Sequence, residues 1–245
     1  MQWYTADLHI HSVLSPCGGL EMGPQDLMQR LIDLHINWLA ITDHNTLANC
    51  PAYANVAQAM GLEFSWGVEV QTAEEIHLLV YFDDPEAAMC FDTELYAALP
   101  DIANDPDFFG DQVVIDEKGN ILKLEPKALS NSVIWDLSQT VEVAKSYGGY
   151  CVPAHVDASV NSIISQLGFL PTEPEFELFG ITAKLKLAQW LQQHPEFEGK
   201  AFLRASDAHY LSDLGMGATR LRLEKASIAD LFKAVRGENR TEMIV

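Results

Sequence analysis

The sequence has little positive charge: 15 Lys and Arg stand against 35 Asp and Glu, so the formal net charge at pH 7 is −20. Proteins that bind nucleic acid or an anionic membrane surface through electrostatic contacts carry basic patches. We therefore expect neither long nucleic acid nor a membrane as a partner. Bound cations would offset part of the negative charge.

Cysteine and long apolar runs are also scarce. The four cysteines, Cys17, Cys50, Cys90 and Cys151, are scattered and form no CxxC pair. This pattern indicates reduced thiols rather than a disulfide framework. No apolar run approaches the roughly 18 residues that cross a bilayer, and the N-terminus lacks a basic segment followed by an apolar one. We predict a cytoplasmic protein without a signal peptide.

What is present fits one α/β domain spanning residues 1–245, because the chain has 245 residues of which 48% are hydrophobic. β-rich runs alternate with helix-compatible stretches, which predicts parallel βαβ units. About seven such units in one chain predict a closed or nearly closed barrel. The predicted strands are 3–11, 38–42, 62–70, 76–82, 150–154, 176–179, 201–206 and 218–223, and the predicted helices are 24–35, 51–60, 85–99, 133–147, 182–193 and 227–236.

Residues 100–130 interrupt this alternation with clustered Asp, Asn, Pro and Gly. Within them, Glu117-Lys118-Gly119-Asn120 separates two apolar runs, which is typical of a β-hairpin. We interpret 100–130 as an insertion on the barrel rim, where its seven acids would narrow the mouth.

The first strand ends in Asp-Leu-His-Ile-His, with His9 and His11 two residues apart. Because the side-chain period of a strand is two, both imidazoles point to the same side and can chelate one metal ion. An isolated HxH is weak evidence, since two polar residues at a strand end give the same pattern.

Further polar residues follow or lie in other predicted strands, most of them at C-terminal ends. Those ends meet at one face of a parallel barrel. Eight nitrogen and oxygen ligands are too many for one ion, so two or three ions of Zn²⁺, Mn²⁺ or Fe²⁺ are expected. The predicted ligands are His9, His11, His44, Glu69, His77, His155, Asp207 and His209.

Some of these residues have simpler alternatives. His77 lies in an apolar strand, where a lone histidine is more often a hydrogen-bonded structural residue. Cys17 follows the HxH in a Pro-Cys-Gly-Gly loop and fits a metal ligand or a structural thiol equally well. His35 fits a contact near a helix C-terminus, and His194 fits a surface residue.

Taken in order, these motifs resemble the PHP (polymerase and histidinol phosphatase) family. The resemblance rests on DLHIHS at Asp7–Ser12, ITDHNT at Ile41–Thr46, GVEV at Gly67–Val70, PAH at Pro153–His155 and SDAH at Ser206–His209, with His77 eight residues after Glu69. It implies a distorted (β/α)₇ TIM-like barrel and a centre of two or three metal ions that hydrolyses phosphate esters.

The resemblance also implies an assignment of ligands to ions. His9, His11, Glu69 and Asp207 would surround one ion, while Glu69 would bridge to a second ion held by His77 and His155. His44 and His209 would hold a third. Members of the family often carry a His or Asp shortly after the HxH for that third ion, and here Cys17 is the nearest candidate.

The expected chemistry is attack on a phosphate ester by a water that the metal ions activate. Asp43 would orient His44 through a hydrogen bond. Lys184, Arg204 and Arg220 are candidates for binding the phosphate group. With so acidic a chain, we expect a small phosphorylated substrate.

Three alternatives stay open. An amidohydrolase also begins with HxH, but a bridging lysine would be expected where Glu69 stands. A non-catalytic metal-binding module would be expected to have lost some ligands. In a nuclease, the polyanionic substrate would have to bind despite repulsion from the acidic protein surface. The substrate, the metal and the oligomeric state are not determined by the sequence.

Overall fold

A computed structural model describes residues 1–238 and 241–245. Its main element is a curled sheet of seven strands in the order β11-β10-β1-β2-β3-β4-β7. These strands are β1 (Gln2–Ile10), β2 (Trp38–Ile41), β3 (Glu63–Gln71), β4 (His77–Phe82), β7 (Tyr150–Pro153), β10 (Thr219–Leu223) and β11 (Glu242–Ile244). A parallel pair, β8 (Leu178–Ile181) and β9 (Ala201–Arg204), forms a separate small sheet.

The pair β8–β9 lies between the two sides of the curled sheet. On one side, Val156 N, just beyond β7, donates to Gly180 O in β8 at 2.9 Å. On the other, Asp207 N donates to His9 O at 3.0 Å, which joins the end of β9 to β1. The strands thus form a half-open barrel, which agrees with the predicted α/β class but not with a closed or nearly closed barrel.

The expectation of uniformly parallel βαβ units is wrong. β1, β2 and β3 pair in parallel, but β4 runs antiparallel to both β3 and β7. The reason is the short link between β3 and β4, Thr72–Ile76, which has no room for a crossover helix. β10 and β11 add a further antiparallel extension beside β1.

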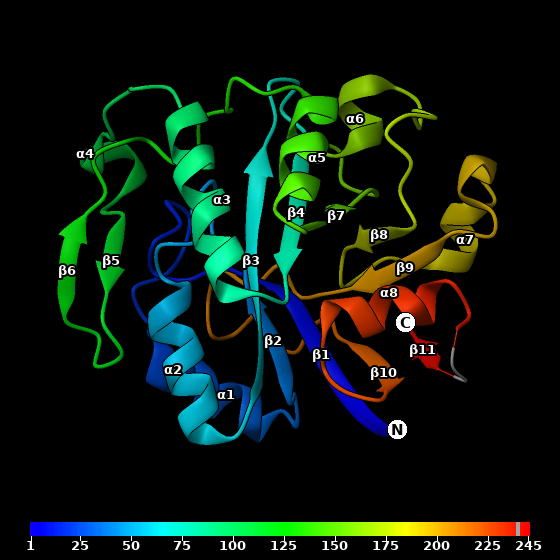
Figure 1. Ribbon diagram of the computed structural model, residues 1–245, viewed down its shortest axis with the longest axis horizontal. Helices are drawn as coiled ribbons and strands as arrows, with labels where there is room; N and C mark the ends of the chain where they lie inside the picture. The colour runs from blue at the N-terminus through cyan, green and yellow to red at the C-terminus, as the bar shows by residue number, and fades with distance from the viewer. Residues whose placement is uncertain (239–240) are drawn as a thin grey trace.

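Helices cover the outside of the sheet, with α3 and α5 in front of β3 and β4 in Figure 1. The longer helices are α1 (Pro24–Asp33), α2 (Cys50–Met60), α3 (Pro85–Ala98), α5 (Leu137–Ser146) and α8 (Ile228–Val235). The short ones are α4 (Pro106–Phe109), α6 (Ile163–Leu167), α7 (Leu187–Leu191) and the 3₁₀ turn η1 (Pro195–Phe197). No helix in the described part of the chain is both long and apolar enough to cross a bilayer.

Two predicted helices are shorter in the structure. The helix expected at 133–147 begins only at Leu137, because Asp136 and Gln139 form a capping box there. The helix expected at 182–193 is reduced to α7, because the Arg204 guanidinium binds the carbonyl oxygens of Thr182, Ala183 and Leu185. Those carbonyls are therefore held in a loop.

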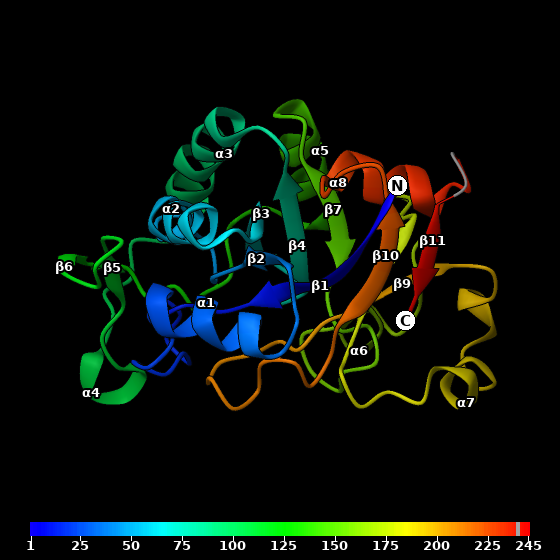
Figure 2. The ribbon, with the colours of Figure 1, turned by 90° about the horizontal axis from the view of Figure 1, so that it is seen from below.

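Alternation along the strands separates two apolar clusters. Val68 and Val70 of β3 pack in the larger cluster beneath the helices, while Leu79 and Tyr81 of β4 pack in a smaller one. The smaller cluster draws on β1, β2, β4, β7, β8, β9 and β10, so it fills the space that the curled sheet encloses, with α8 at one end. Figure 2 shows α8 beside the N-terminus, away from the hairpin β5–β6.

Residues 100–130 contain α4 and the hairpin of β5 (Val113–Ile115) and β6 (Ile121–Leu124), close to the predicted one. The hairpin projects to the left in Figure 1. Asn49 fixes it to the barrel, donating to Val113 O at 3.1 Å and accepting from Ile115 N at 3.0 Å. We continue to interpret this segment as an insertion in a single domain.

Candidate metal centre

The predicted ligands converge at one end of the barrel. His9 and Glu69 lie near the ends of β1 and β3. His44, His155 and Asp207 lie in the loops just after β2, β7 and β9. The C-terminal ends of parallel strands meet at one edge, which brings these residues together. His77 joins them from the opposite end of its strand, because β4 is antiparallel and starts where β3 ends.

A register shift in β1 helps to direct the first two histidines. The pairing of β1 with β2 shifts between Asp7 and Ile10. Accordingly, Leu8 packs in the enclosed apolar cluster and Ile10 packs in the outer one beneath the helices. The Nε2 atoms of His9 and His11 lie only 3.2 Å apart, so the two rings converge as expected, although this shift interrupts the two-residue alternation from which the expectation was drawn.

Glu69 is the centre of the cluster and is 1% exposed. Five imidazoles surround its carboxylate. His9 Nε2, His155 Nε2 and His77 Nδ1 lie 3.2, 3.2 and 3.1 Å from Oε1, while His11 Nε2 and His44 Nδ1 lie 3.4 and 3.2 Å from Oε2. Asp207 completes the group, with Oδ1 at 3.2 Å from the Nε2 atoms of both His9 and His11.

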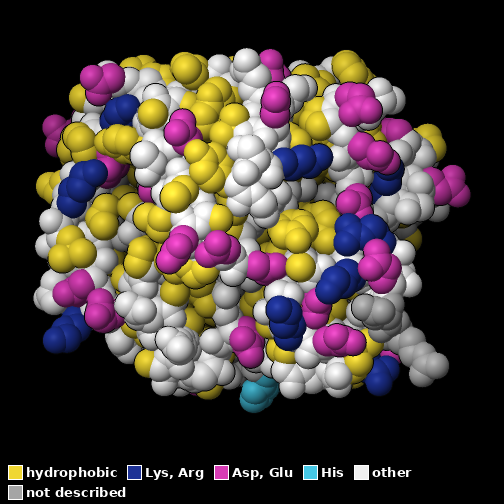
Figure 3. Space-filling model, viewed as in Figure 1, with side chains coloured by type: hydrophobic (Ala, Val, Ile, Leu, Met, Phe, Trp, Pro, Cys, Tyr) yellow, Lys and Arg dark blue, Asp and Glu magenta, His cyan; other side chains and the backbone are white. Residues whose placement is uncertain are grey.

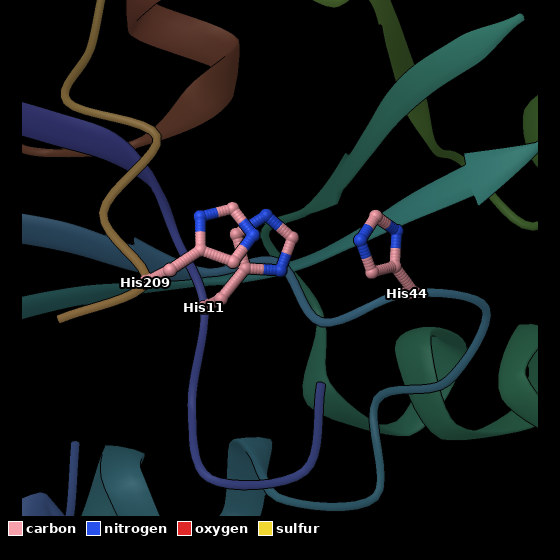
Figure 4. A group of neighbouring side chains, drawn as sticks. All are labelled: His11, His44 and His209. Atoms are coloured by element: carbon pink, nitrogen blue, oxygen red, sulfur yellow. The ribbon is translucent and has the colours of Figure 1, made fainter. Parts of the chain in front are cut away.

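Within the described residues, three sets of side chains have ligand atoms close enough for one metal ion: His9, His11 and Glu69; His44, Glu69 and His77; and His11, His44 and His209. Glu69 belongs to two of these sets, as expected for a bridging carboxylate. The third set differs from the sequence expectation, since His11 joins His44 and His209 (Figure 4). The rings of His11 and His209 are stacked with centroids 4.1 Å apart.

The donor atoms fit metal ions better than they fit one another. Several buried atoms of the cluster have no hydrogen-bond partner in the described structure, namely Glu69 Oε1, His44 Nδ1, His77 Nδ1 and Asp207 Oδ1. Buried polar atoms without partners are costly, so such a convergence is suited to binding a cation. Ligand atoms about 2.0–2.2 Å from a tetrahedral ion lie roughly 3.3–3.6 Å apart. The observed separations of 3.1–3.4 Å are at or slightly below that spacing.

The charges of the cluster also call for cations. Burial opposes ionisation of Glu69, but the neighbouring imidazoles, His77 first, hold its pKa well below the usual range. Burial opposes protonation of His11 as well, yet Asp207 and Glu69 raise its pKa well above that of a free imidazole. The buried, ionised carboxylates are therefore stabilised by nearby positive charge. Protons on the imidazoles or bound divalent ions can supply that charge. Binding a metal ion here would release protons.

A hydrogen-bond chain holds His11 from behind. Its Nδ1 lies 2.8 Å from Ser15 Oγ, and that hydroxyl donates to Asp43 Oδ1 at 2.7 Å. Asp43 also accepts from Ser12 N at 2.7 Å and from Ser12 Oγ at 2.6 Å. Asp43 therefore contacts His11 through Ser15, whereas the sequence analysis had linked it to the ring of His44. Ser15 gave no signal in the sequence, because serine is common in loops, and Ser12 was marked only as the last residue of the DLHIHS motif.

His77 is oriented in a similar way. Its Nε2 lies 3.2 Å from Gln71 Oε1 and 2.8 Å from the side-chain amide of Asn161. Its Nδ1 then faces Glu69. This geometry favours the ligand interpretation of His77 over the purely structural one, because only one ring nitrogen is used by the protein.

Several residues at the site have strained backbone. His155 and Asp207 have φ angles of 27° and 53°, and Asn45 and Asn161 have 54° and 56°. Positive φ is uncommon for residues other than glycine and tends to occur at functional sites. At His155 this turn follows directly after β7 and redirects the side chain toward Glu69.

The other candidates lie elsewhere or have other roles. Cys17 is exposed and belongs to none of the three sets in the described residues. The Arg204 guanidinium is occupied by three backbone carbonyls, and Arg220 lies over the Trp3 ring at 4.9 Å. Lys184 is exposed, with no ion pair among the described residues.

A cavity of about 320 Å³ opens at the cluster and includes His44, Glu69, His77, His155 and Asp207 in its lining. None of the lining residues comes from the segment 100–130, so that segment does not narrow this cavity. On the face shown in Figure 3, acidic side chains are scattered among basic and apolar ones, and histidine is visible at only one place, on the lower edge.

Comparison with known proteins identifies the family. The PHP domain model matches residues 7–151, and the chain belongs to this family, as its motifs predicted. The 5'-3' exoribonuclease Rnm of Salmonella typhimurium is 38% identical over 73 residues, which cover 29% of this chain and 24% of that protein.

Solved structures of similar fold include the lesion-specific endonuclease EndoQ of Pyrococcus furiosus, with a TM-score of 0.72 at 15% identity, covering 100% of this chain and 58% of that one. Endonuclease Q in complex with a 27-mer duplex that has an abasic lesion at the active site gives a TM-score of 0.71 at 15% identity. This match covers 98% of this chain and 58% of that one. An amidohydrolase of Chromobacterium violaceum gives 0.59 at 18% identity, covering 97% of each chain. The chain thus spans only part of the exoribonuclease and of endonuclease Q.

These findings correct the expectation about partners. A small phosphorylated substrate, to the exclusion of long nucleic acid, is contradicted by relatives that include an exoribonuclease and an endonuclease bound to duplex DNA. The inference failed because the net charge of −20 describes the whole chain. Substrate binding depends on the local potential at the site, to which bound metal ions contribute most.

Proposed function

We propose that this protein hydrolyses phosphodiester bonds of nucleic acid at a centre of two or three divalent metal ions. The observation that carries the proposal is the buried Glu69 carboxylate with five imidazole nitrogens at 3.1–3.4 Å and no hydrogen-bond partner for Oε1 in the described structure. The donor set supports a metal site, since imidazole and carboxylate suit Zn²⁺, Mn²⁺ and Fe²⁺.

Each predicted ligand has a proposed place. His9, His11, Glu69 and Asp207 would hold one ion, and Glu69, His77 and His155 a second. His44 and His209 would hold a third, together with His11, whose Nε2 lies between Glu69 and Asp207. Divalent ions bound here supply a nucleophilic water at neutral pH and neutralise the charge that develops on the phosphoryl oxygens.

The residues of the chain hold this arrangement in place. Asp43, through Ser15, orients His11, and Gln71 orients His77. Asp207 is partly exposed, with 35% of its side chain accessible, and it lines the cavity beside the buried Glu69. A phosphate group entering the cavity would therefore meet Asp207 and His209 at its edge before the interior ligands.

Nucleic acid as the substrate is supported by the names of the relatives. One is an exoribonuclease and two of the similar structures are of a DNA endonuclease, one with a duplex at its active site. One of the structures with a similar fold is an amidohydrolase, so hydrolysis of an amide or a lactone is the competing assignment. Against it, the position expected for a bridging lysine is occupied by Glu69.

The test is a comparison of substrates with chelated protein reloaded with Zn²⁺, Mn²⁺ or Fe²⁺. The panel contains single-stranded RNA, single-stranded DNA, duplex DNA, bis(p-nitrophenyl) phosphate, and an amide and a lactone. We expect metal-dependent cleavage of at least one nucleic acid. Hydrolysis of the amide or lactone alone would favour the amidohydrolase assignment. Stoichiometric metal binding without any hydrolysis would indicate a non-catalytic module.

A further inference from the structure

We propose that Lys184 and the cavity beside Asp207 form a subsite for a phosphate of a single-stranded nucleic acid, next to the phosphate that is cleaved. This inference rests on the proposed function and specifies how the same site would hold its substrate. It adds a binding residue that lies outside the ligand set of the metal centre.

The cavity continues the one at the metal centre. Its volume is about 410 Å³, and its lining includes Thr182, Lys184, Asp207, Asp213 and Met216. The cavity at the cluster is about 320 Å³ and shares two of these residues, Thr182 and Asp207. A nucleic acid strand bound across the metal centre could therefore extend into this cavity on the side of Asp207.

Of the three cations considered from the sequence, only Lys184 is free to bind a phosphate. The Arg204 guanidinium donates to Thr182 O at 2.8 Å, Ala183 O at 3.0 Å and Leu185 O at 3.1 Å. The Arg220 guanidinium stacks over Trp3. Lys184 is exposed and makes no ion pair among the described residues. An ammonium group at the edge of such a cavity is an ordinary phosphate contact.

The loop that carries Lys184 is held firmly at its base. Beyond the three contacts from Arg204, the Asp157 carboxylate accepts from Thr182 N at 2.9 Å and from Thr182 Oγ1 at 2.5 Å. The backbone on both sides of Lys184 is thus fixed before any ligand binds. Preorganisation of this kind lowers the entropy lost on binding, so a single lysine contributes more than one on a free loop.

Asp213 lines the same cavity and decides which kind of ligand fits. Its carboxylate would repel a simple anion, and it forms no ion pair with Lys184 in the described structure. A nucleotide has both groups that this pair can bind: a phosphate for Lys184, and sugar hydroxyl or base N–H donors for Asp213. We assign the cavity to one nucleotide unit of the strand.

The experiment compares Lys184→Ala and Lys184→Arg with the matched control Lys186→Ala. Lys186 is also exposed, is two residues away in the same loop, and lines neither cavity. The probes are a short fluorescein-labelled single-stranded RNA, its DNA counterpart and bis(p-nitrophenyl) phosphate, which has no neighbouring phosphate. KM, kcat and binding anisotropy are measured at several salt concentrations with metal-loaded protein.

We expect Lys184→Ala to raise KM for the cleaved oligonucleotide about tenfold relative to KM for the small diester, with kcat changed much less. The slope of log KM against log salt should fall by about 0.7, the contribution of one phosphate contact in a single strand. Lys184→Arg should keep both values near wild type. Lys186→Ala should behave as wild type.

Suppose that the enzyme cleaves the oligonucleotide, but that Lys184→Ala and Lys186→Ala have the same ratio of KM for the oligonucleotide to KM for the small diester and the same salt slope. This result would overturn the subsite and leave the proposed function standing. Failure of the wild-type protein to cleave any nucleic acid, duplex DNA included, would overturn the proposed function. In that case the anisotropy measurement tests the subsite separately: tight binding lost in Lys184→Ala supports it, and undiminished or undetectable binding rejects it.

Discussion

The Oγ atom of Ser15 lies 2.7 Å from Oδ1 of Asp43, and both side chains are buried. A serine hydroxyl can donate one hydrogen bond, and Asp43 accepts it. The same oxygen, 2.8 Å from His11 Nδ1, must then accept a hydrogen bond from that nitrogen. The proton of neutral His11 is thereby placed on Nδ1, and its Nε2 lone pair faces Glu69 and Asp207.

Replacing Ser15 with Ala should therefore weaken metal binding without unfolding the protein. Residues that orient a metal-ligating histidine typically contribute 10–100-fold in metal affinity, and we expect a loss of about this size. Loss of the two buried hydrogen bonds of this hydroxyl should cost about 1–3 kcal/mol of stability. Metal affinity by titration calorimetry and Tm by thermal unfolding measure the two effects.

Ser138→Ala is the control for this change, because Ser138 is exposed on α5. It should alter neither quantity. If Ser15→Ala keeps wild-type metal affinity while its Tm falls, Ser15 stabilises the loop only, and the orienting role is wrong.

Glu69→Gln should abolish hydrolysis and lower the bound metal while the fold is retained. The amide keeps the size of the side chain but removes the charge that two sets of ligands share. The effect should exceed the roughly 10–100-fold that follows loss of an outer partner of a ligand. Activity assays and metal analysis of the purified variant measure it.

The matched change is Glu63→Gln, in the same strand but exposed at its far end. This control should keep full activity and metal content. A Glu69→Gln protein with both properties intact would refute the assignment of Glu69 as a bridging ligand.

Cys17→Ser should leave metal content unchanged and activity close to wild type. Cys17 is exposed and lies in none of the sets of potential ligands among the described residues. Metal analysis after gel filtration gives the stoichiometry directly. Loss of an equivalent of metal, with the other ions kept, would show that the thiol is a ligand after all.

Asp7 should make the metal-free protein less stable as pH rises. Burial raises the pKa of Asp7 to about 7, against hydrogen bonds from Ser206 that lower it. Between pH 4 and 7 the folded protein then holds a proton that the unfolded chain, with a pKa near 3.8, has released. The free energy of unfolding due to this group therefore decreases as pH rises through that window.

Asp7→Asn removes this titration while leaving an oxygen to accept from Ser206 N, which donates to Asp7 Oδ1 at 2.9 Å. Urea unfolding in the presence of a chelator, at several pH values, gives the difference between the two proteins. We expect the variant to gain stability relative to wild type from pH 4 to pH 7. A difference that does not depend on pH would contradict the raised pKa.

The sequence was sufficient for the family and for most of the convergence at the site. The HxH spacing predicted that His9 and His11 converge, and polar residues after apolar strands marked His44, His155 and Asp207. These signals are local, because they depend on the two-residue period of a strand and on where an apolar run stops. The PHP domain match over residues 7–151 confirms the resemblance.

Strand direction was decided only by the tertiary structure. Nothing within residues 76–82 distinguishes a parallel from an antiparallel strand, since both alternate in the same way. The antiparallel course of β4 places His77 beside Glu69, with Nδ1 and Oε1 3.1 Å apart. His77 thus faces the cluster, although it is the first residue of its strand and the other ligands lie near the C-terminal ends of theirs.

Contacts between distant loops were likewise beyond the sequence. Ser15 meets Asp43 across 28 positions, and Arg204 meets the carbonyls around Lys184 across about 20. The type of residue shows what a side chain can donate or accept, but which partner it meets depends on how the strands curl and bring their loops together. For that reason the sequence predicted the candidate ligands, and the structure showed which side chains contact them and that Lys184 makes no ion pair among the described residues.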